Sequence, residues 1–252
     1  MPDLDSRLLE ALVDEDRTAE ENTQLVRLMR LFVELEPPPD PYDLFPDYAG
    51  HKDNFLKALE KLDGDLVEGT FLNLYCHVHG HEAPYTRDER RLVDATGGYW
   101  CHAGGISPLL KAEPFIHPQT VSADFGAGNG LQGLLFQRLY PHRKTIQIEI
   151  SSRMVDAGRQ LQEWLGIPQE RVEWVVGDVN DASPTNMDFV YLYRPVRPEG
   201  RGRRFYQDLA RTLEAQNHPV VIFSIADCLR DFLSPRFEVF YAGGHLTCFR
   251  SR

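Results

Sequence analysis

The spacing of the hydrophobic positions changes near residue 120 of this 252-residue chain. Before that point, apolar residues recur at steps of three and four, which is the spacing of amphipathic helices. Residues 18–36 show this pattern, and Thr18 and Glu21 have the spacing of a capping box. The sequence therefore predicts a helix that begins directly after Thr18 and presents one apolar face.

Further helices are predicted in the same N-terminal part. Thr86 and Glu89 repeat the capping-box spacing, and Gly97 ends the segment that follows them. Ser107 followed by Pro108 is typical of an N-cap and the first residue of a helix. The other predicted helical segments are residues 51–64 and 65–78.

After residue 120, short strand-like runs alternate with amphipathic segments. The predicted strands cover residues 120–125, 144–150, 171–176, 187–193 and 219–225, and the predicted helices cover 130–140, 151–166 and 203–216. The last two runs, 236–242 and 245–250, meet at two glycines and predict an antiparallel hairpin. Alternating strands and helices indicate a doubly wound, mostly parallel α/β sheet that is covered on both faces. We therefore expect an all-helical domain over residues 1–115 and a sheet domain over residues 116–252.

The composition is that of an ordinary globular protein, but the charge is uneven. Residues 1–120 carry 23 acidic and 11 basic side chains, whereas the rest of the chain is nearly balanced. An acidic surface repels phosphate backbones, so we expect no nucleic-acid partner. The chain has no long apolar run and no recognisable signal peptide, so we expect neither a membrane span nor a membrane partner. Four scattered cysteines are typical of a reducing compartment, which predicts a cytoplasmic protein.

Residues 124–130, DFGAGNG, place an acidic residue and three glycines directly after the first predicted strand. Ligands of parallel sheets bind at the carboxyl ends of the strands, and glycine lets a ligand approach the backbone closely. Dinucleotides and S-adenosylmethionine are the two ligand classes that use such a loop. The literal G-x-G-x-x-G starts at Gly128, whereas the first glycine after the strand is Gly126. Asp124 is unfavourable beside a pyrophosphate and favourable beside ammonium and sulfonium charges, which favours S-adenosylmethionine.

Two more carboxylates follow the next two predicted strands. Glu149 ends the second strand, where a carboxylate accepts hydrogen bonds from the hydroxyls of a ribose. NAD enzymes place an acid similarly, so Glu149 alone does not discriminate between the two ligand classes. Asp178 follows the third strand, where its side chain can accept a hydrogen bond from an adenine amino group. Both positions are those of a nucleoside site.

Four segments, in this order, resemble class I S-adenosylmethionine-dependent methyltransferases. They are ADFGAGNG, IQIEIS, GDVND and DFVYLYRPV, and the resemblance covers about residues 105–252. It implies a seven-stranded sheet whose last pair is an antiparallel hairpin, with the N-terminal helices as a lid that selects the substrate. It also implies that the glycine loop holds the methionine part of S-adenosylmethionine, Glu149 the ribose and Asp178 the adenine. The cofactor-binding residues expected from the resemblance are Asp124, Gly126, Gly128, Asn129, Gly130, Glu149, Ile150, Asp178 and Val179.

The segment after the fourth strand departs from one branch of this family. Methyltransferases that act on the amino groups of nucleic-acid bases carry Asp/Asn-Pro-Pro-aromatic there, whereas this chain has Tyr193, Arg194, Pro195 and Val196. We therefore expect an S-adenosylmethionine-dependent methyltransferase that acts on a small molecule. Two alternatives remain, an NAD(P)-dependent oxidoreductase and a module that binds a cofactor or a partner without catalysis.

The Cys- and His-rich stretches 75–85 and 97–105 are expected on the acceptor side of the site. Their polar side chains suit a base or an acceptor-orienting group. The candidate catalytic residues are His81, Glu82, His102 and Tyr193. A zinc site is an alternative, although no C-x-x-C is present, and helix capping is another. We assign no metal ligand.

Four residues are expected to bind the acceptor. Tyr85 and Trp100 supply aromatic walls, and Arg194 and Arg197 have the chemistry to clamp a carboxylate or phosphate. A solvated basic loop that balances the acidic N-terminal half is the alternative reading of the arginines. We expect the acceptor pocket between the N-terminal helices and the glycine loop.

Overall fold

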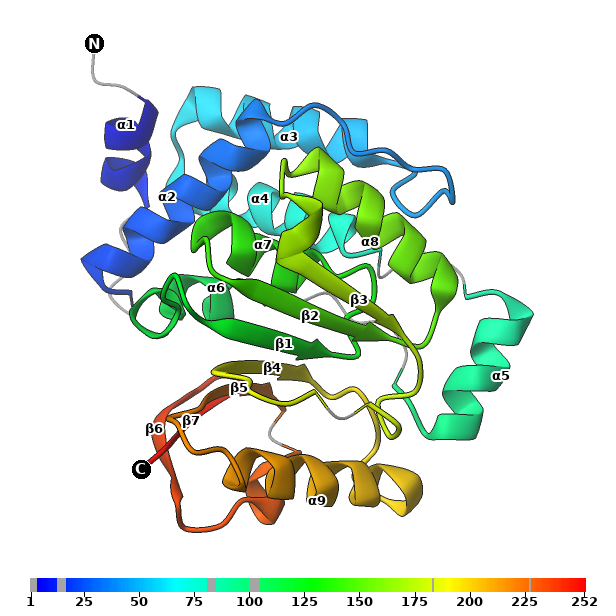
Figure 1. Ribbon diagram of the computed structural model, residues 1–252. Helices are drawn as coiled ribbons and strands as arrows, with labels where there is room; N and C mark the ends of the chain where they lie inside the picture. The colour runs from blue at the N-terminus through cyan, green and yellow to red at the C-terminus, as the bar shows by residue number, and fades with distance from the viewer. Residues whose placement is uncertain (1–3, 13–16, 81–84, 100–104, 183, 227) are drawn as a thin grey trace.

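A seven-stranded sheet forms the centre of the molecule in the computed structural model (Figure 1). The structure describes residues 4–12, 17–80, 85–99, 105–182, 184–226 and 228–252. The strands are β1 (Val121–Phe125), β2 (Lys144–Glu149), β3 (Val172–Val176), β4 (Phe189–Tyr193), β5 (Val221–Ile225), β6 (Phe237–Gly243) and β7 (Leu246–Ser251). They lie in the order β3-β2-β1-β4-β5-β7-β6 across the sheet.

The first five strands are parallel, and β7 is antiparallel to both of its neighbours, β5 and β6. The mostly parallel seven-stranded sheet and the C-terminal hairpin expected from the sequence are therefore confirmed. β1 lies between β2 and β4, so the direction in which strands are added reverses at β1. The carboxyl ends of β1 and β4 consequently flank the kind of crevice in which doubly wound sheets bind ligands.

Helices cover both faces of the sheet. They are α1 (Leu4–Ala11), α2 (Ala19–Glu34), α3 (Tyr48–Lys61), α4 (Gly64–Val78), α5 (Arg87–Thr96), α6 (Ser107–Lys111), α7 (Leu131–Leu139), α8 (Ser152–Trp164) and α9 (Gly200–Glu214). In Figure 1, α7 and α8 lie on one face with α2, α3 and α4 beyond them, and α9 lies on the other face. α5 lies beside the carboxyl ends of the parallel strands, which places it over the crevice.

The N-terminal helices share a hydrophobic core with one face of the sheet. Phe32 of α2 packs edge-on against Phe71 of α4, with ring centroids 5.5 Å apart. Phe136 of α7 packs in the same way against Phe189 of β4 at 5.2 Å, and all four rings belong to one buried cluster. Because this cluster is continuous, α2 and α4 are anchored on the sheet through α7. The boundary between residues 115 and 116 stays a prediction.

The local signals in the sequence match most helix ends. Thr18 and Thr86 both form the predicted capping boxes, with Glu21 and Glu89 as their partners. Ser107 was the wrong residue for the third N-cap: Ile106 precedes the helix, and Ser107 is its first residue. The cause is that the carbonyl of Ile106 already accepts the hydrogen bonds that start this short helix. No helix of the described chain has the length and apolar character needed to cross a bilayer.

Candidate active site

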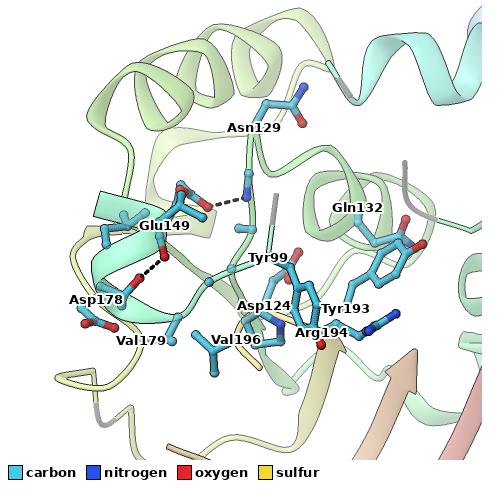
Figure 2. A pocket seen from close by; sticks show the side chains of 18 of the residues that line it. Tyr99, Asp124, Asn129, Gln132, Glu149, Asp178, Val179, Tyr193, Arg194 and Val196 are labelled. Carbon is cyan, nitrogen blue, oxygen red and sulfur yellow. Dashed lines mark hydrogen bonds between the residues drawn. The ribbon is translucent and has the colours of Figure 1, made fainter. Parts of the chain in front are cut away.

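A cleft lies at the carboxyl ends of β1, β2 and β4 (Figure 2). The residues predicted for the site that line it are Tyr85, Asp124, Gly126, Gly128, Asn129, Glu149, Ile150, Asp178, Val179, Tyr193 and Arg194. Glu149, Asp178 and Val179 lie together toward one end of this view, and Tyr193 and Arg194 lie together on the other side. The tertiary structure thus gathers all the predicted cofactor residues except Gly130, together with Tyr85, Tyr193 and Arg194 from the predicted acceptor side, around one space.

The three glycines of the loop serve different purposes, although all have positive φ. A Cβ on Gly128 would meet no described atom within 4 Å, so this glycine presents bare backbone to the cleft. A Cβ on Gly126 would come within 2.8 Å of the Pro195 Cβ, and one on Gly130 would overlap the ring of Trp174. Gly126 and Gly130 are therefore required for close packing, and Gly130 does not line the cleft.

Glu149 holds the glycine loop in place. One carboxylate oxygen accepts the backbone N–H of Gly128 at 2.8 Å, and the other accepts the N–H of Ser151 at 2.9 Å. The side chain is 8% exposed. Burial raises the pKa of Glu149, although the backbone donors of Ser151 and Gly128 act in the opposite direction. Each oxygen keeps a lone pair, so the carboxylate can still accept hydrogen bonds from a ligand.

Asp124 is the more deeply buried carboxyl, at 3% exposure. Burial raises the pKa of Asp124 to about 8, and the nearby Glu149 adds to the shift. Neither carboxylate forms an ion pair with a basic side chain in the described part of the chain. Two buried acids without a countercharge favour a cationic ligand. Burial destabilises the ionised form of a carboxyl group, and a nearby cation stabilises it.

Polar atoms without partners lie beside Asp124. The Tyr191 hydroxyl and Gln132 Nε2 are buried and have no hydrogen-bond partner among the described residues. Tyr191 pairs with Asp124 across the sheet, and the Tyr75 hydroxyl donates to Gln132 Oε1 at 2.6 Å. Tyr75 thereby orients the amide of Gln132. Because buried polar groups normally have partners, these two atoms indicate a polar ligand.

Asn129 has a structural role that the sequence did not reveal. Its Nδ2 donates to the Val78 carbonyl at 2.8 Å, and its Oδ1 accepts the Leu131 N–H at 3.2 Å. The side chain therefore ties the loop to the end of α4 and occupies a donor at the start of α7. These two bonds occupy the side chain, and the predicted contact of Asn129 with the cofactor stays a prediction.

Asp178 lies at the other end of the cleft. Its Oδ1 accepts both the backbone N–H and the side-chain amide of Asn180, at 2.9 and 2.7 Å. The second oxygen carries no described hydrogen bond, and Val179 supplies an apolar wall next to it. This combination suits the polar edge and the flat face of a purine base.

Helix α5 is clamped over the cleft by Glu89. The Glu89 carboxylate forms a bidentate pair with Arg153, at 3.0 Å for both bonds, and accepts the Ser151 hydroxyl. Burial acts to raise the pKa of Glu89, but the bonds from Arg153 and Ser151 outweigh it and hold the pKa at about 2. Ser151 and Arg153 begin α8, so the clamp joins α5 to the strand end that carries Glu149.

A second link joins the end of α5 to the segment after β4. The Tyr99 N–H donates to the Pro195 carbonyl at 3.2 Å, and the Arg197 N–H donates to the Gly97 carbonyl at 2.9 Å. Tyr99 lines the cleft, and its ring lies 4.4 Å from the guanidinium carbon of Arg194 and 5.5 Å from that of Arg197. Sequence reasoning missed Tyr99. The sequence feature that could have indicated Tyr99 is its position next to Trp100 in the stretch GGYWCHAGG.

The remaining predicted residues are not all at the cleft. His81, Glu82, Trp100 and His102 lie outside the described residues, so their roles stay predictions. Arg197 stacks on Tyr99 but does not line the cleft. No group of three or more Cys, His, Asp or Glu side chains in the described segments is arranged to hold a metal ion.

Comparison with known proteins shows similarity of structure only. No family model matches the chain, and no curated protein matches its sequence. An RNA methyltransferase from Salinibacter ruber, solved with S-adenosyl-L-homocysteine, is similar with a TM-score of 0.44 and 20% identity over 67% of this chain and 92% of that one. TrmN from Thermus thermophilus has a TM-score of 0.43 and 16% identity over 57% and 48%. An rRNA methylase from Streptococcus thermophilus has a TM-score of 0.40 and 12% identity over 55% and 89%.

These similarities concern the fold, and the chain spans about half the length of TrmN. The observed seven-stranded sheet with its antiparallel C-terminal hairpin is the one that the resemblance to class I methyltransferases implies.

One expectation from the sequence, that nucleic acid is excluded as a partner, is wrong. Solved structures of this fold that resemble the chain include an RNA methyltransferase and an rRNA methylase. The physical reason is that the net charge of the N-terminal half does not describe the local surface at the site. Arg194 lines the cleft and Arg197 stacks on Tyr99 beside it, and both lie in the part of the chain whose charge is nearly balanced.

Proposed function

We propose that the protein is an S-adenosylmethionine-dependent methyltransferase. The observation that carries the proposal is the pair Asp124 and Glu149, two buried carboxylates that face one cleft without a basic side chain of the described chain to pair with. S-adenosylmethionine brings an ammonium and a sulfonium, so it supplies the positive charge that this arrangement favours.

The residues present suit each part of this cofactor. Gly128 offers open backbone, and Asp124, Gln132 and Tyr191 offer polar atoms for the methionine part. Glu149 has remaining lone pairs for ribose hydroxyls, and Asp178 beside Val179 suits adenine. These assignments agree with those that the family resemblance implies.

A dinucleotide fits the same cleft poorly. Its pyrophosphate would need the free N–H groups at the start of α7, but the side chain of Asn129 already accepts the Leu131 N–H. The carboxylates of Asp124 and Glu149 would also repel the phosphates. Both observations count against the oxidoreductase alternative.

Methyl transfer from this cofactor requires the protein mainly to align the acceptor with the methyl group. When bound, S-adenosylmethionine supplies a methyl group on a sulfonium, which an acceptor lone pair displaces in line. Tyr193 and Tyr99 line the cleft next to Arg194 and restrict the directions from which an acceptor reaches it. Val93 and Thr96 of α5 line the cleft, and the contacts of Glu89 and Tyr99 hold this helix in place.

The acceptor expected from the sequence is a small molecule, and it remains part of this proposal. Support comes from the aromatic side chains at 85, 99 and 193, which line the cleft together with residues of α5. An acceptor carried on a macromolecule must present its reacting group deep enough to pass α5.

Two measurements test the proposal. Calorimetry is expected to show binding of S-adenosylmethionine and S-adenosylhomocysteine and none of NAD or NADP; the opposite preference would refute the assignment. Incubation with methyl-labelled cofactor, in parallel with small-molecule fractions, protein and total RNA of a cell extract, then identifies the acceptor. Label in RNA instead of a small molecule would contradict the acceptor part, and binding without any labelled product would favour the non-catalytic alternative.

A further inference from the structure

We propose that the acceptor carries an anionic group, a carboxylate or a phosphate, that Arg194 recognises at the mouth of the cleft. This inference rests on the proposed methyltransferase function and names the chemistry of its substrate. It concerns the side of the cleft away from Glu149 and Asp178 (Figure 2).

The charges around the cleft isolate Arg194. Its lining contains the carboxylates of Asp124, Glu149 and Asp178, and Arg194 is the one arginine or lysine among the described lining residues. Arg194 forms no ion pair with a described carboxylate, and its Nε is a buried donor without a described hydrogen-bond partner. A guanidinium with an unused donor binds a carboxylate or phosphate more strongly than a neutral group, because the hydrogen bond is charge-assisted. Arg194 is therefore a cation of the cleft with a buried donor that an anion on a ligand can bind.

The backbone fixes Arg194 beside the reacting end of the cleft. Arg194 follows β4 directly and has a φ of +45°, a backbone conformation that residues other than glycine rarely adopt. Pro195 lies against Gly126 so closely that a Cβ on this glycine would clash. The Tyr99 N–H then holds the Pro195 carbonyl from the α5 side. Such a strained position persists only because its neighbours determine it on both sides.

Tyr99 orients the guanidinium. The Arg194 guanidinium carbon lies 4.4 Å from the centroid of the Tyr99 ring, the distance of a cation–π contact. Stacking occupies one face of the planar group, and the guanidinium also interacts with the side chains of Tyr99 and Cys228. Nε remains a donor on its edge that no described acceptor uses. This is the arrangement that recognises a carboxylate or phosphate through two parallel bonds.

The carboxylate of the cofactor is the competing partner for Arg194. Gln132 Nε2 and the Tyr191 hydroxyl are unpartnered donors beside Asp124 and offer that carboxylate a place of its own. The acceptor is thus the remaining source of the anion. The two possibilities differ in what loss of Arg194 does to binding of S-adenosylhomocysteine, which carries the same carboxylate.

The test uses calorimetry on the full chain, first with S-adenosylhomocysteine alone. Benzoate and phenyl phosphate are then titrated into the protein saturated with S-adenosylhomocysteine, with phenol and benzylamine as neutral and cationic probes. At least one anionic probe is expected to bind about tenfold or more tightly than phenol and benzylamine. The better of the two anionic probes distinguishes a carboxylate from a phosphate.

In Arg194→Gln, the affinity for the anionic probe is expected to fall about tenfold or more, while that for S-adenosylhomocysteine stays within about threefold. Arg194→Lys keeps the charge without the planar fork and is expected to retain part of the affinity. Arg204→Gln is the matched control, because Arg204 also follows β4 in the chain but pairs with Asp208 on the exposed side of α9. It is expected to bind both ligands like the wild type.

Three outcomes would overturn the inference. They are equal binding of phenol and the anionic probes, no binding of either anionic probe to the loaded protein, and a parallel loss of S-adenosylhomocysteine affinity in a folded Arg194→Gln. The last outcome would assign Arg194 to the cofactor. Failure of the wild type to bind S-adenosylhomocysteine would instead refute the methyltransferase function itself, so the two failures are separable.

Discussion

The carboxylate of Glu149 accepts a hydrogen bond from the backbone N–H of Gly128 at 2.8 Å (Figure 2). This bond joins the end of β2 to the one loop glycine whose Cβ position is open to the cleft. A single side chain thus shapes the loop and presents acceptor oxygens to a ligand. Loss of Glu149 is therefore expected to affect both the loop and the cofactor.

Glu149→Gln is expected to weaken binding of S-adenosylmethionine by about 1.5–3 kcal/mol, or roughly 10- to 100-fold, because a charged acceptor is lost. Calorimetry measures the affinity, and thermal unfolding verifies that the variant is folded. Glu173→Gln is the control, since Glu173 pairs with Lys144 on the exposed edge of the sheet. Equal affinities of wild type and a folded Glu149→Gln would show that Glu149 is not at the ribose.

The stability of the ligand-free protein is expected to fall as the pH rises from about 4 toward 8. Burial raises the pKa of Asp124 to about 8 in the folded chain, above its value of about 3.9 in the unfolded chain. The folded state therefore holds this proton more tightly, and stability is lost progressively as the pH passes from the unfolded to the folded pKa. Denaturant unfolding across this range should show a smaller decline in Asp124→Asn. Identical profiles for the two proteins would argue against a protonated Asp124.

Affinity for S-adenosylmethionine is expected to change in the opposite direction with pH. Ionised Asp124 attracts the cationic cofactor, so the affinity should rise from about pH 6 to about pH 8, below which range the carboxyl is neutral. Asp124→Asn should bind more weakly and with a flatter profile. Isothermal calorimetry in two buffers of different ionisation enthalpy should also detect proton release on binding to the wild type at about pH 7. Absence of proton release would contradict the role of Asp124.

Two alanine substitutions in the glycine loop are expected to differ. Gly128→Ala places a methyl group in the cleft and should lower cofactor affinity, with a backbone strain of about 1–2 kcal/mol. Gly126→Ala also meets Pro195 and should destabilise the fold further. Gly166 has positive φ and open space but lies after α8, away from the cleft, so Gly166→Ala controls for strain alone. A loss of affinity in Gly166→Ala as large as in Gly128→Ala would refute the assignment of Gly128.

The Glu89 clamp is expected to stabilise the protein at neutral pH and to fail in acid. Its pKa of about 2 in the folded chain, held down by Arg153 and Ser151, means that its contribution is present above about pH 4.5 and is lost as the pH falls toward 2. Glu89→Gln should lower the free energy of unfolding by about 1–3 kcal/mol at pH 7 and by less at pH 3. Asp88→Asn, which removes an exposed pair with Arg91, should change it by less than about 1 kcal/mol. Equal effects of the two substitutions on the free energy of unfolding would contradict a stabilising role of Glu89.

The order of the elements could be predicted from the sequence because it depends on local spacing. Apolar steps of three and four predicted α2, and the capping boxes at Thr18 and Thr86 placed two helix starts to the residue. Alternating strands and helices predicted a parallel sheet, and two glycines predicted the β6–β7 turn. A carboxylate at a strand end is also a local feature, so Asp124 and Glu149 were predicted at the site and do line the cleft.

Contacts between distant segments were decided by the tertiary structure alone. The stacking of Arg194 on Tyr99 joins residues 95 positions apart, and nothing in the local spacing of either segment indicates it. The same holds for Gly126, whose missing side chain accommodates Pro195, and for Asn129, whose amide holds the Val78 carbonyl. A sequence pattern records which conformations a segment prefers, whereas close approach depends on where the packed sheet and helices bring two segments together. The sequence by itself therefore determined the framework and its acidic residues, and the tertiary structure decided which glycine presents open backbone to the cleft and which arginine lines it.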